Sequence, residues 1–161
     1  MAATFHLRPY READQEPSIA LWLETWTLAY PSIDFDARVD WWRKRWRDEL
    51  VPTATVIVAE SDGTMAGFVT IDPSGYLDQL VVAPAHQGSP LATALVDEAK
   101  RLSPDGVTLK VNADNFRAIR FYVRNGFIDV GEDFNPGSKR PVRKMAWVAG
   151  QTFADTKNQV S

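Results

Sequence analysis

The residues of this chain that are best placed to do chemistry lie in one stretch, residues 115–127. Asn115 is a suitable helix N-cap, because its side chain can accept a hydrogen bond from an N–H group of the first turn. Gly126 can adopt the left-handed conformation that commonly ends a helix. Between them lies Tyr122, whose phenol has an ordinary pKa of about 10 and can donate a proton or a hydrogen bond. The sequence therefore predicts a short helix that carries a candidate proton donor.

The same stretch is also compatible with an ordinary amphipathic helix that has no part in catalysis. In that interpretation three apolar residues face a core, Phe116, Ile119 and Val123. Tyr122 would then be a packed tyrosine whose hydroxyl has a hydrogen-bond partner. Both interpretations stay open on these residues alone.

A second candidate site is a strand, a tight turn and a helix over residues 80–92. In such a turn backbone N–H groups point toward an anion such as a pyrophosphate, and the partial positive charge at the helix start attracts it further. Gly88 lets the backbone approach the anion closely. Pro90 suits a first helical turn but has no N–H to donate, although the Ser89 hydroxyl can replace that donor. A turn without any ligand is the alternative.

Both segments resemble motifs of the GCN5-related N-acetyltransferases. Residues 115–127 follow the pattern Asn-x-x-Ala-x-x-Phe-Tyr-x-x-x-Gly-Phe, which is similar to the late signature of that family. Residues 82–92 are similar to its acyl-CoA motif, Gln/Arg-x-x-Gly-x-Gly/Ala preceded by Val-x-Pro. Pro90 departs from the motif, because the family usually has glycine at that position.

The resemblance implies that acetyl-CoA is the co-substrate. Tyr122 holds the position of the family's usual general acid, beside the sulfur of acetyl-CoA. The backbone of a bulged central strand would pair with the pantetheine arm as an added strand does. The residues implied to contact the cofactor are Leu80, Val81, Val82, Gln87, Gly88, Ser89, Leu91, Ala92, Asn115 and Tyr122.

The general base that would take the proton of the attacking amine is less defined. One branch of the family uses a glutamate on the strand before the late helix, but the matching residue here is Lys110, and an ammonium cannot be a base. Asp78 is the nearest carboxylate along the chain, and we expect it to act as a base or to bind the amine. A solvated strand end, His86 as the base, and a chain of water molecules are the alternatives.

Aromatic residues are concentrated in the first third of the chain, and helical spacing predicts that most of them are core. They are Trp22, Trp26, Tyr30, Trp41, Trp42 and Trp46. Trp26 and Tyr30 lie near the end of the first predicted helix, and we expect them to bind the acceptor. Aromatic walls can hold a cationic amine by cation–π contact.

Composition indicates one soluble globular domain over residues 1–149, followed by a polar and flexible tail over residues 150–161. The net charge of −3 gives no footprint for nucleic acid, and no apolar run is long enough to span a bilayer. The chain has no cysteine and two distant histidines, so we expect no metal site. No signal-peptide pattern is present, and we expect a cytoplasmic protein. A homodimer is one assembly that the resemblance implies.

Hydrophobic periodicity predicts the order β-α-α-β-β-β-α-β-α-β-β. Helical spacing covers residues 16–30, 36–50 and 90–102 and the stretch after Asn115, while Pro31 and Pro52 end the first two helices. Strands are predicted at residues 4–7, 54–60, 65–71, 76–83, 107–111, 128–134 and 142–148. We therefore expect an α/β (α+β) domain with a mixed sheet of about seven strands and helices on both faces, as in the GCN5-related fold.

These observations favour an acetyl-CoA-dependent N-acetyltransferase. The acceptor, a small-molecule or peptide primary amine, would attack the thioester directly in a ternary complex, because no nucleophile for a covalent intermediate is evident. The alternative is an inactive acyl-CoA-binding or protein-interaction module on the same fold, which Pro90 and the absence of a carboxylate at position 110 favour.

Overall fold

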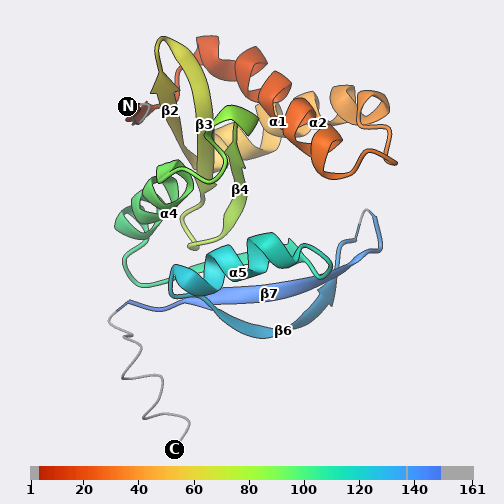
Figure 1. Ribbon diagram of the computed structural model, residues 1–161, viewed down its shortest axis with the longest axis vertical. Helices are drawn as coiled ribbons and strands as arrows, with labels where there is room; N and C mark the ends of the chain where they lie inside the picture. The colour runs from red at the N-terminus through yellow and green to blue at the C-terminus, as the bar shows by residue number, and fades with distance from the viewer. Residues whose placement is uncertain (1–3, 137, 150–161) are drawn as a thin grey trace, which may run out of the picture.

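The computed structural model describes residues 4–136 and 138–149 (Figure 1), so the predicted polar tail lies outside the described residues. Seven strands form two sheets. The first sheet is antiparallel and has the order β1-β2-β3-β4, with β1 (His6–Pro9), β2 (Thr55–Ser61), β3 (Thr64–Ile71) and β4 (Leu77–Val82). The second is also antiparallel and has the order β5-β7-β6, with β5 (Val107–Asn112), β6 (Ile128–Phe134) and β7 (Pro141–Trp147).

Four helical regions cover these sheets. They are α1 (Gln15–Ala29), a compound helix of α2 (Val39–Arg45), η3 (Trp46–Leu50) and α3 (Val51–Thr53), α4 (Leu91–Leu102) and α5 (Phe116–Arg124). The single helix predicted over residues 36–50 is corrected in two ways. It contains a π-helical turn, η3, and it continues past Pro52, which lies in the first turn of α3 where a missing N–H is tolerated.

The first strand lies two residues later than predicted, at His6–Pro9 instead of residues 4–7. Pro9 is the last residue of β1 and lies opposite Ile57. β1 is an edge strand of its sheet, where the absent N–H of a proline disrupts no further hydrogen bond.

The two sheets touch at one point and then diverge. Tyr76 and Thr108 form an isolated parallel bridge, and the Thr108 N–H donates to the Gly75 carbonyl at 2.9 Å. Beyond this bridge β4 and β5 have no mutual pairing, and Figure 1 shows the two sheets separating into a wedge. We call this opening between β4 and β5 the wedge, and the Tyr76–Thr108 bridge its apex.

A bulge in β4 sets which side chains face which core. Val69 pairs with Leu80 and Ile71 with Leu77, so two residues of β4, Asp78 and Gln79, lie opposite the single residue between them. This extra residue reverses the alternation of side chains along the strand. As a result Leu77, Leu80 and Val82 all pack on the core under α4, while Val81 packs on the core under α1 and α2.

A charged network joins β1 to the start of α1, and we predict that it makes stability depend on acid pH. Both oxygens of Asp14 accept hydrogen bonds from Arg8 at 2.7 Å, and the Arg11 N–H donates a third at 2.7 Å. The hydrogen bonds from Arg8 lower the pKa of Asp14 against the opposing effect of burial. At neutral pH, Asp14→Asn should reduce the free energy of unfolding by about 1.5–3 kcal/mol.

The sign of the pH effect follows from the lowered pKa of Asp14. As pH falls below the ordinary aspartate value of about 4, the unfolded chain takes up the proton first and the wild type loses stability. The difference between wild type and Asp14→Asn in urea titrations should therefore shrink between about pH 5 and pH 2. The exposed neighbour provides a control, because Glu12→Gln should leave stability nearly unchanged. A difference that stays constant with pH would contradict this account.

Candidate active site

The walls of the wedge are strand edges that have no partner strand. β4 pairs with β3 on one side only, and β5 pairs with β7 on one side only. Backbone N–H and C=O groups on such edges can pair with an extended ligand. The predicted cofactor residues Leu80, Val81 and Val82 form the β4 wall. This edge can therefore hold a linear chain that carries amide groups.

The turn before α4 presents free backbone donors. In the part of the chain that the structure describes, the N–H groups of Gly88, Ala92 and Thr93 have no acceptor. Gly88 has φ +82°, a left-handed conformation that suits glycine, and no atom lies within 4 Å of where its Cβ would be. Gln87 is exposed and its amide reaches the Val82 carbonyl at 3.4 Å. Three free donors at the start of a helix suit an anion.

Ser89 and Pro90 build the first turn of α4 and add no free donor. The Ser89 hydroxyl donates to the His86 carbonyl at 2.5 Å and accepts from the Leu91 N–H at 3.3 Å. Pro90 has φ −66°, and its carbonyl accepts from the Ala94 N–H at 3.0 Å. The hydroxyl of Ser89 is thus already occupied by the turn. The Leu91 side chain is fully buried in the core.

The helix after Asn115 forms as predicted. Asn115 caps it by accepting from the Ala118 N–H at 3.2 Å. Gly126 ends it with φ +90°, and the Phe127 N–H returns to the Tyr122 carbonyl at 3.0 Å. The alternative of an ordinary helix placed Phe116, Ile119 and Val123 in the core, but only Ile119 packs against it, whereas Phe116 and Val123 are exposed.

The face of α5 that packs inward is the one that carries the tyrosine. Phe116 is 64% exposed and Val123 is 55% exposed, whereas Tyr122 is only 8% exposed. The Tyr122 ring lies edge-on to those of Phe121 and Phe127, at 5.2 and 5.4 Å between centroids. Among the described residues its hydroxyl has no hydrogen-bond partner. Burial raises the pKa of Tyr122 above its ordinary value, so the phenol stays protonated.

The starts of α4 and α5 both lie at the open end of the wedge. β4 and β5 begin side by side at the apex, and each is followed by a helix that runs back toward it. The two helices meet near their last residues, where Lys100 Nζ donates to the Asn125 carbonyl at 2.5 Å. Their first turns therefore lie where the strands are farthest apart, and both helix dipoles present their positive ends there.

Sequence reasoning missed three arginines on α5. Arg117, Arg120 and Arg124 are exposed and make no ion pair or hydrogen bond with any described residue. Their spacing of three and four residues places them on one helical face and is the signal that could have identified them. They add positive charge to the exposed face of α5.

Asp78 lies in the β4 bulge and is held by an arginine. Arg45 donates to Asp78 Oδ2 at 2.6 Å and to Oδ1 at 3.2 Å, and the Gln79 amide donates to Oδ1 at 2.8 Å. Burial has the largest single effect on the pKa of Arg45 and would lower it, but the hydrogen bonds to Asp78 and the charges of Asp78 and Glu49 together raise that pKa. Burial and the charge of Asp78 also raise the pKa of Tyr76, at the apex, to about 12.

Trp26 and Tyr30 do lie together, at a second opening. Their rings stack with centroids 5.7 Å apart. The Tyr30 hydroxyl accepts from the Asn112 amide at 3.0 Å and donates to Asp114 Oδ1 at 3.3 Å. Burial first, and then the charge of Asp114, raise the pKa of Tyr30. No sequence pattern indicated Asn112 or Asp114 at this place, because each lies more than 80 positions from Tyr30.

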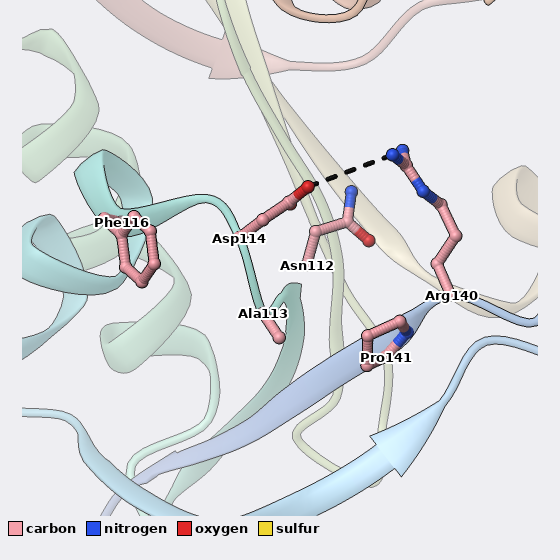
Figure 2. A pocket seen from close by; sticks show the side chains of 6 residues that line it. All are labelled: Asn112, Ala113, Asp114, Phe116, Arg140 and Pro141. Carbon is pink, nitrogen blue, oxygen red and sulfur yellow. Dashed lines mark ion pairs between the residues drawn. The ribbon is translucent and has the colours of Figure 1, made fainter.

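Next to this group lies a hollow of about 260 Å³ (Figure 2). It is lined by Asn112, Ala113, Asp114, Phe116, Arg140 and Pro141. Arg140 immediately precedes β7, and its side chain points toward Asp114 across the hollow.

Two other residues that were considered for the general base lie elsewhere. Lys110 forms an ion pair with Asp133 at 3.2 Å, and His86 belongs to the turn before α4. Within residues 4–136 and 138–149, no three His, Cys, Asp or Glu side chains gather as a metal site would need. Across the same ranges, no helix has the length and apolar character to cross a membrane.

Residues 16–127 of the chain match the Acetyltransferase (GNAT) family. This segment holds α1, the wedge, the turn before α4 and all of α5. The chain belongs to the GNAT acetyltransferase family. The predicted family and enzyme class, an acyltransferase, are thereby confirmed.

Two relatives of this GNAT protein are named as peptidyl-lysine N-acetyltransferases. It is 29% identical over 150 residues to the peptidyl-lysine N-acetyltransferase YiaC of Escherichia coli strain K12, covering 91% of this chain and 99% of the relative. It is 29% identical over 130 residues to the peptidyl-lysine N-acetyltransferase YjaB of Salmonella typhimurium, covering 76% of this chain and 82% of the relative.

Solved structures share the fold. The apo form of YjaB from Escherichia coli superposes with a TM-score of 0.74 at 24% identity, covering 91% of this chain and 99% of the other. The PaiA N-acetyltransferase of Thermoplasma acidophilum, solved in complex with coenzyme A, superposes with a TM-score of 0.70 at 20% identity, covering 90% and 99%. The predicted α/β fold class is confirmed, with its seven strands divided into two sheets at the wedge.

The ion pair in the β4 bulge gives a prediction for this GNAT domain. Asp78→Asn removes the charge that Arg45 needs, and the free energy of unfolding should fall by about 1.5–3 kcal/mol in urea titrations. The matched control is Asp48→Asn, which breaks the exposed pair with Arg47 and should leave stability nearly unchanged. Equal stability of Asp78→Asn and wild type would show that the ion pair does not hold the bulge.

Proposed function

We propose that this protein transfers the acetyl group of acetyl-CoA to the side-chain amine of a lysine in a protein or peptide. The observation that carries the proposal is the buried Tyr122 side chain, whose hydroxyl has no hydrogen-bond partner among the described residues, on a helix that borders a wedge with free backbone donors. The names of YiaC and YjaB support the choice of a lysine acceptor.

Acetyl-CoA fits the wedge in one direction. Its pyrophosphate would accept hydrogen bonds from the free N–H groups of Gly88, Ala92 and Thr93, beside the start of α4. Its pantetheine arm, which carries two amide groups, would pair with the edge of β4 at Leu80–Val82, as an added strand does. Arg117, in the first turn of α5, is unpaired among the described residues and supplies counter-charge at the open end. The thioester would then lie deeper in the wedge, toward Tyr122.

The reaction joins the lysine nitrogen to the thioester carbon. The neutral amine attacks the carbonyl carbon, a C–N bond forms, and the C–S bond breaks as the electron pair leaves on sulfur. One proton leaves the nitrogen and one proton is finally taken up by the sulfur, so charge balances. A lysine ammonium has a pKa of about 10.4, so it must be deprotonated before the attack.

Tyr122 would donate a hydrogen bond to the departing sulfur. Because burial raises its pKa, the phenol is a weaker acid than the thiol it would generate, whose ordinary pKa is about 8.5. A persistent phenolate is therefore unfavourable. We assign Tyr122 the stabilisation of the developing thiolate, with the amine as the final source of the proton.

Deprotonation of the amine is best assigned to water. The Asp78 carboxylate is the predicted base, but its oxygens are already hydrogen-bonded to Arg45 and Gln79. Both oxygens of Asp78 therefore already accept hydrogen bonds from within the protein and are not directed at an incoming amine. We propose that Asp78 positions the β4 bulge and, through it, the strand edge that holds the thioester.

An inactive acyl-CoA-binding module is the second candidate, and Pro90 favours it. The proline removes one N–H from the start of α4, and the Ser89 hydroxyl is engaged in the turn. Such a module would bind acetyl-CoA without transferring its acetyl group to any amine.

Titration with acetyl-CoA tests the binding part of the proposal. At 100 times Kd, ligand binding adds about 2.7 kcal/mol of stability, which should raise Tm by about 5–11 °C in a domain of this size. Pro90→Ala restores an N–H donor, and calorimetry should show binding about tenfold tighter. Thr93→Ala keeps its backbone N–H and serves as the control with unchanged Kd. No Tm shift at millimolar acetyl-CoA would refute the proposed site.

Substitution of the tyrosine tests the chemistry. Tyr122→Phe should reduce kcat for a lysine peptide by about 100-fold or more, because the departing sulfur loses its hydrogen-bond donor. The hydroxyl has no partner among the described residues, so the free energy of unfolding should stay within about 0.5 kcal/mol of wild type. A Tyr122→Phe protein with full kcat would remove this residue from the mechanism.

A further inference from the structure

Arg140 lies in a group of side chains whose chemistry suits a cation-binding site. Its guanidinium carbon lies 4.9 Å from the centroid of the Tyr30 ring. Its Nη2 lies 3.9 Å from Asp114 Oδ2, and Figure 2 shows the side chain reaching across the hollow toward that carboxylate. An aromatic face beside a carboxylate is the arrangement that binds ammonium and guanidinium groups.

The aromatic wall of this site is fixed by its neighbours. The Tyr30 hydroxyl is hydrogen-bonded to Asn112 and Asp114, and its ring is stacked on Trp26. These contacts join the end of α1 to the end of β5, so they hold the ring in one orientation. A fixed ring and carboxylate form a prearranged site, which loses little conformational freedom when a cation binds.

Arg140 itself is held loosely in the site. The 3.9 Å separation from Asp114 is too long for a hydrogen bond, whereas Arg45 approaches Asp78 to 2.6 Å and Arg143 approaches Asp129 to 2.7 Å. The Asp114 side chain is 61% exposed and that of Arg140 is 39% exposed. No other described side chain forms an ion pair with either group. Another cation can therefore take the place of Arg140 at small cost.

The group bound at this site is not the amine that reacts. Asp114 precedes the cap of α5, whereas Tyr122 lies in the second half of that helix. Eight residues at 1.5 Å each separate the two positions by roughly 12 Å along the helix. An acceptor that reaches both places must carry two basic groups. In an extended peptide, roughly 12 Å corresponds to about three or four residues.

We propose that Asp114 and Tyr30 bind a second basic side chain of the peptide acceptor, a few residues from the reacting lysine, and that Arg140 occupies this place until the acceptor displaces it. The inference rests on the proposed lysine acetyltransferase function and names its preferred substrates, peptides with a flanking arginine or lysine. Arg140 is then an internal competitor of the acceptor.

The two charged residues should have opposite effects, which a merely structural role would not produce. For a peptide with one reacting lysine and an arginine three residues away, Asp114→Asn should raise KM about fivefold to thirtyfold, and Arg140→Gln should lower KM several-fold. For the same peptide with glutamine in place of the arginine, both variants should match wild type. The kcat values should stay unchanged.

Matched variants separate this effect from general loss of charge or fold. Asn at position 114 keeps an oxygen for the Tyr30 hydroxyl, so Tm should hold. Arg143 lies on β7 and pairs with Asp129 and Glu132, so Arg143→Gln should leave the KM of both peptides unchanged. A higher KM for the arginine peptide in Arg140→Gln would show that Arg140 binds an acceptor group itself and would overturn the inference. Equal effects on both peptides would also overturn it.

Failure of the proposed function can be told apart from failure of this inference. If acetyl-CoA raises Tm but neither peptide is acetylated, the lysine acetyltransferase proposal fails. Fluorescence anisotropy with the labelled arginine and glutamine peptides then tests the cation site alone. Selective binding of the arginine peptide that weakens in Asp114→Asn and tightens in Arg140→Gln supports the site. Identical binding of both peptides by all variants overturns it.

Discussion

The unpaired strand edges between β4 and β5 are the constraint on which the rest of the structure depends. Backbone N–H and C=O groups that are withdrawn from water need hydrogen-bond partners. Here the bridge between Tyr76 and Thr108 holds β4 and β5 together at the apex. Toward the open end each of the two strands has a neighbour on only one side. An extended ligand that carries amide groups can pair with these free edges. The β4 bulge also belongs to this arrangement, because it turns Leu80 and Val82 toward the core that both sheets share.

The wedge is held firmly at one end and lightly at the other. At the apex a shared core contains Leu77 from the first sheet and Val107, Leu109 and Met145 from the second. At the open end the two halves meet through the hydrogen bonds of Tyr30 with Asn112 and Asp114. Local changes at the open end therefore disturb few buried contacts, whereas changes at the apex disturb the whole core.

The sequence contained enough to predict most elements but not how they join. The hairpin of β2 and β3 follows from β-branched runs around the Asp62-Gly63 turn, where both residues have positive φ. The α5 helix follows from its cap and its terminal glycine. These signals are local, so they can be read from neighbouring residues. Three of the predicted aromatic core residues, Trp22, Trp42 and Trp46, are buried, but Trp41 is 60% exposed because it lies on the outer face of α2.

The candidate site, like the fold, could be predicted only where its residues lie close together in the sequence. The turn at Gly88 and the helix of Tyr122 each lie within one short segment, whereas the partner of Asp78 is 33 positions away and the partners of Tyr30 are more than 80 away. Such pairings depend on how the sheets diverge, which no periodicity encodes. The alternative that placed Phe116 and Val123 in the core of α5 is wrong for a related reason. An apolar residue at helical spacing indicates a face, but only the tertiary structure decides whether Phe116 or Tyr122 is on the inside.

The position of Arg140 has a consequence for how such a protein can diversify. It lies in the connection between β6 and β7, outside the shared core and far from the residues that would handle the thioester. A substitution there can change which acceptors are favoured while the folding free energy and the transfer machinery stay nearly intact. Substitutions in this one connection can therefore change acceptor preference during evolution without passing through a variant of low folding stability.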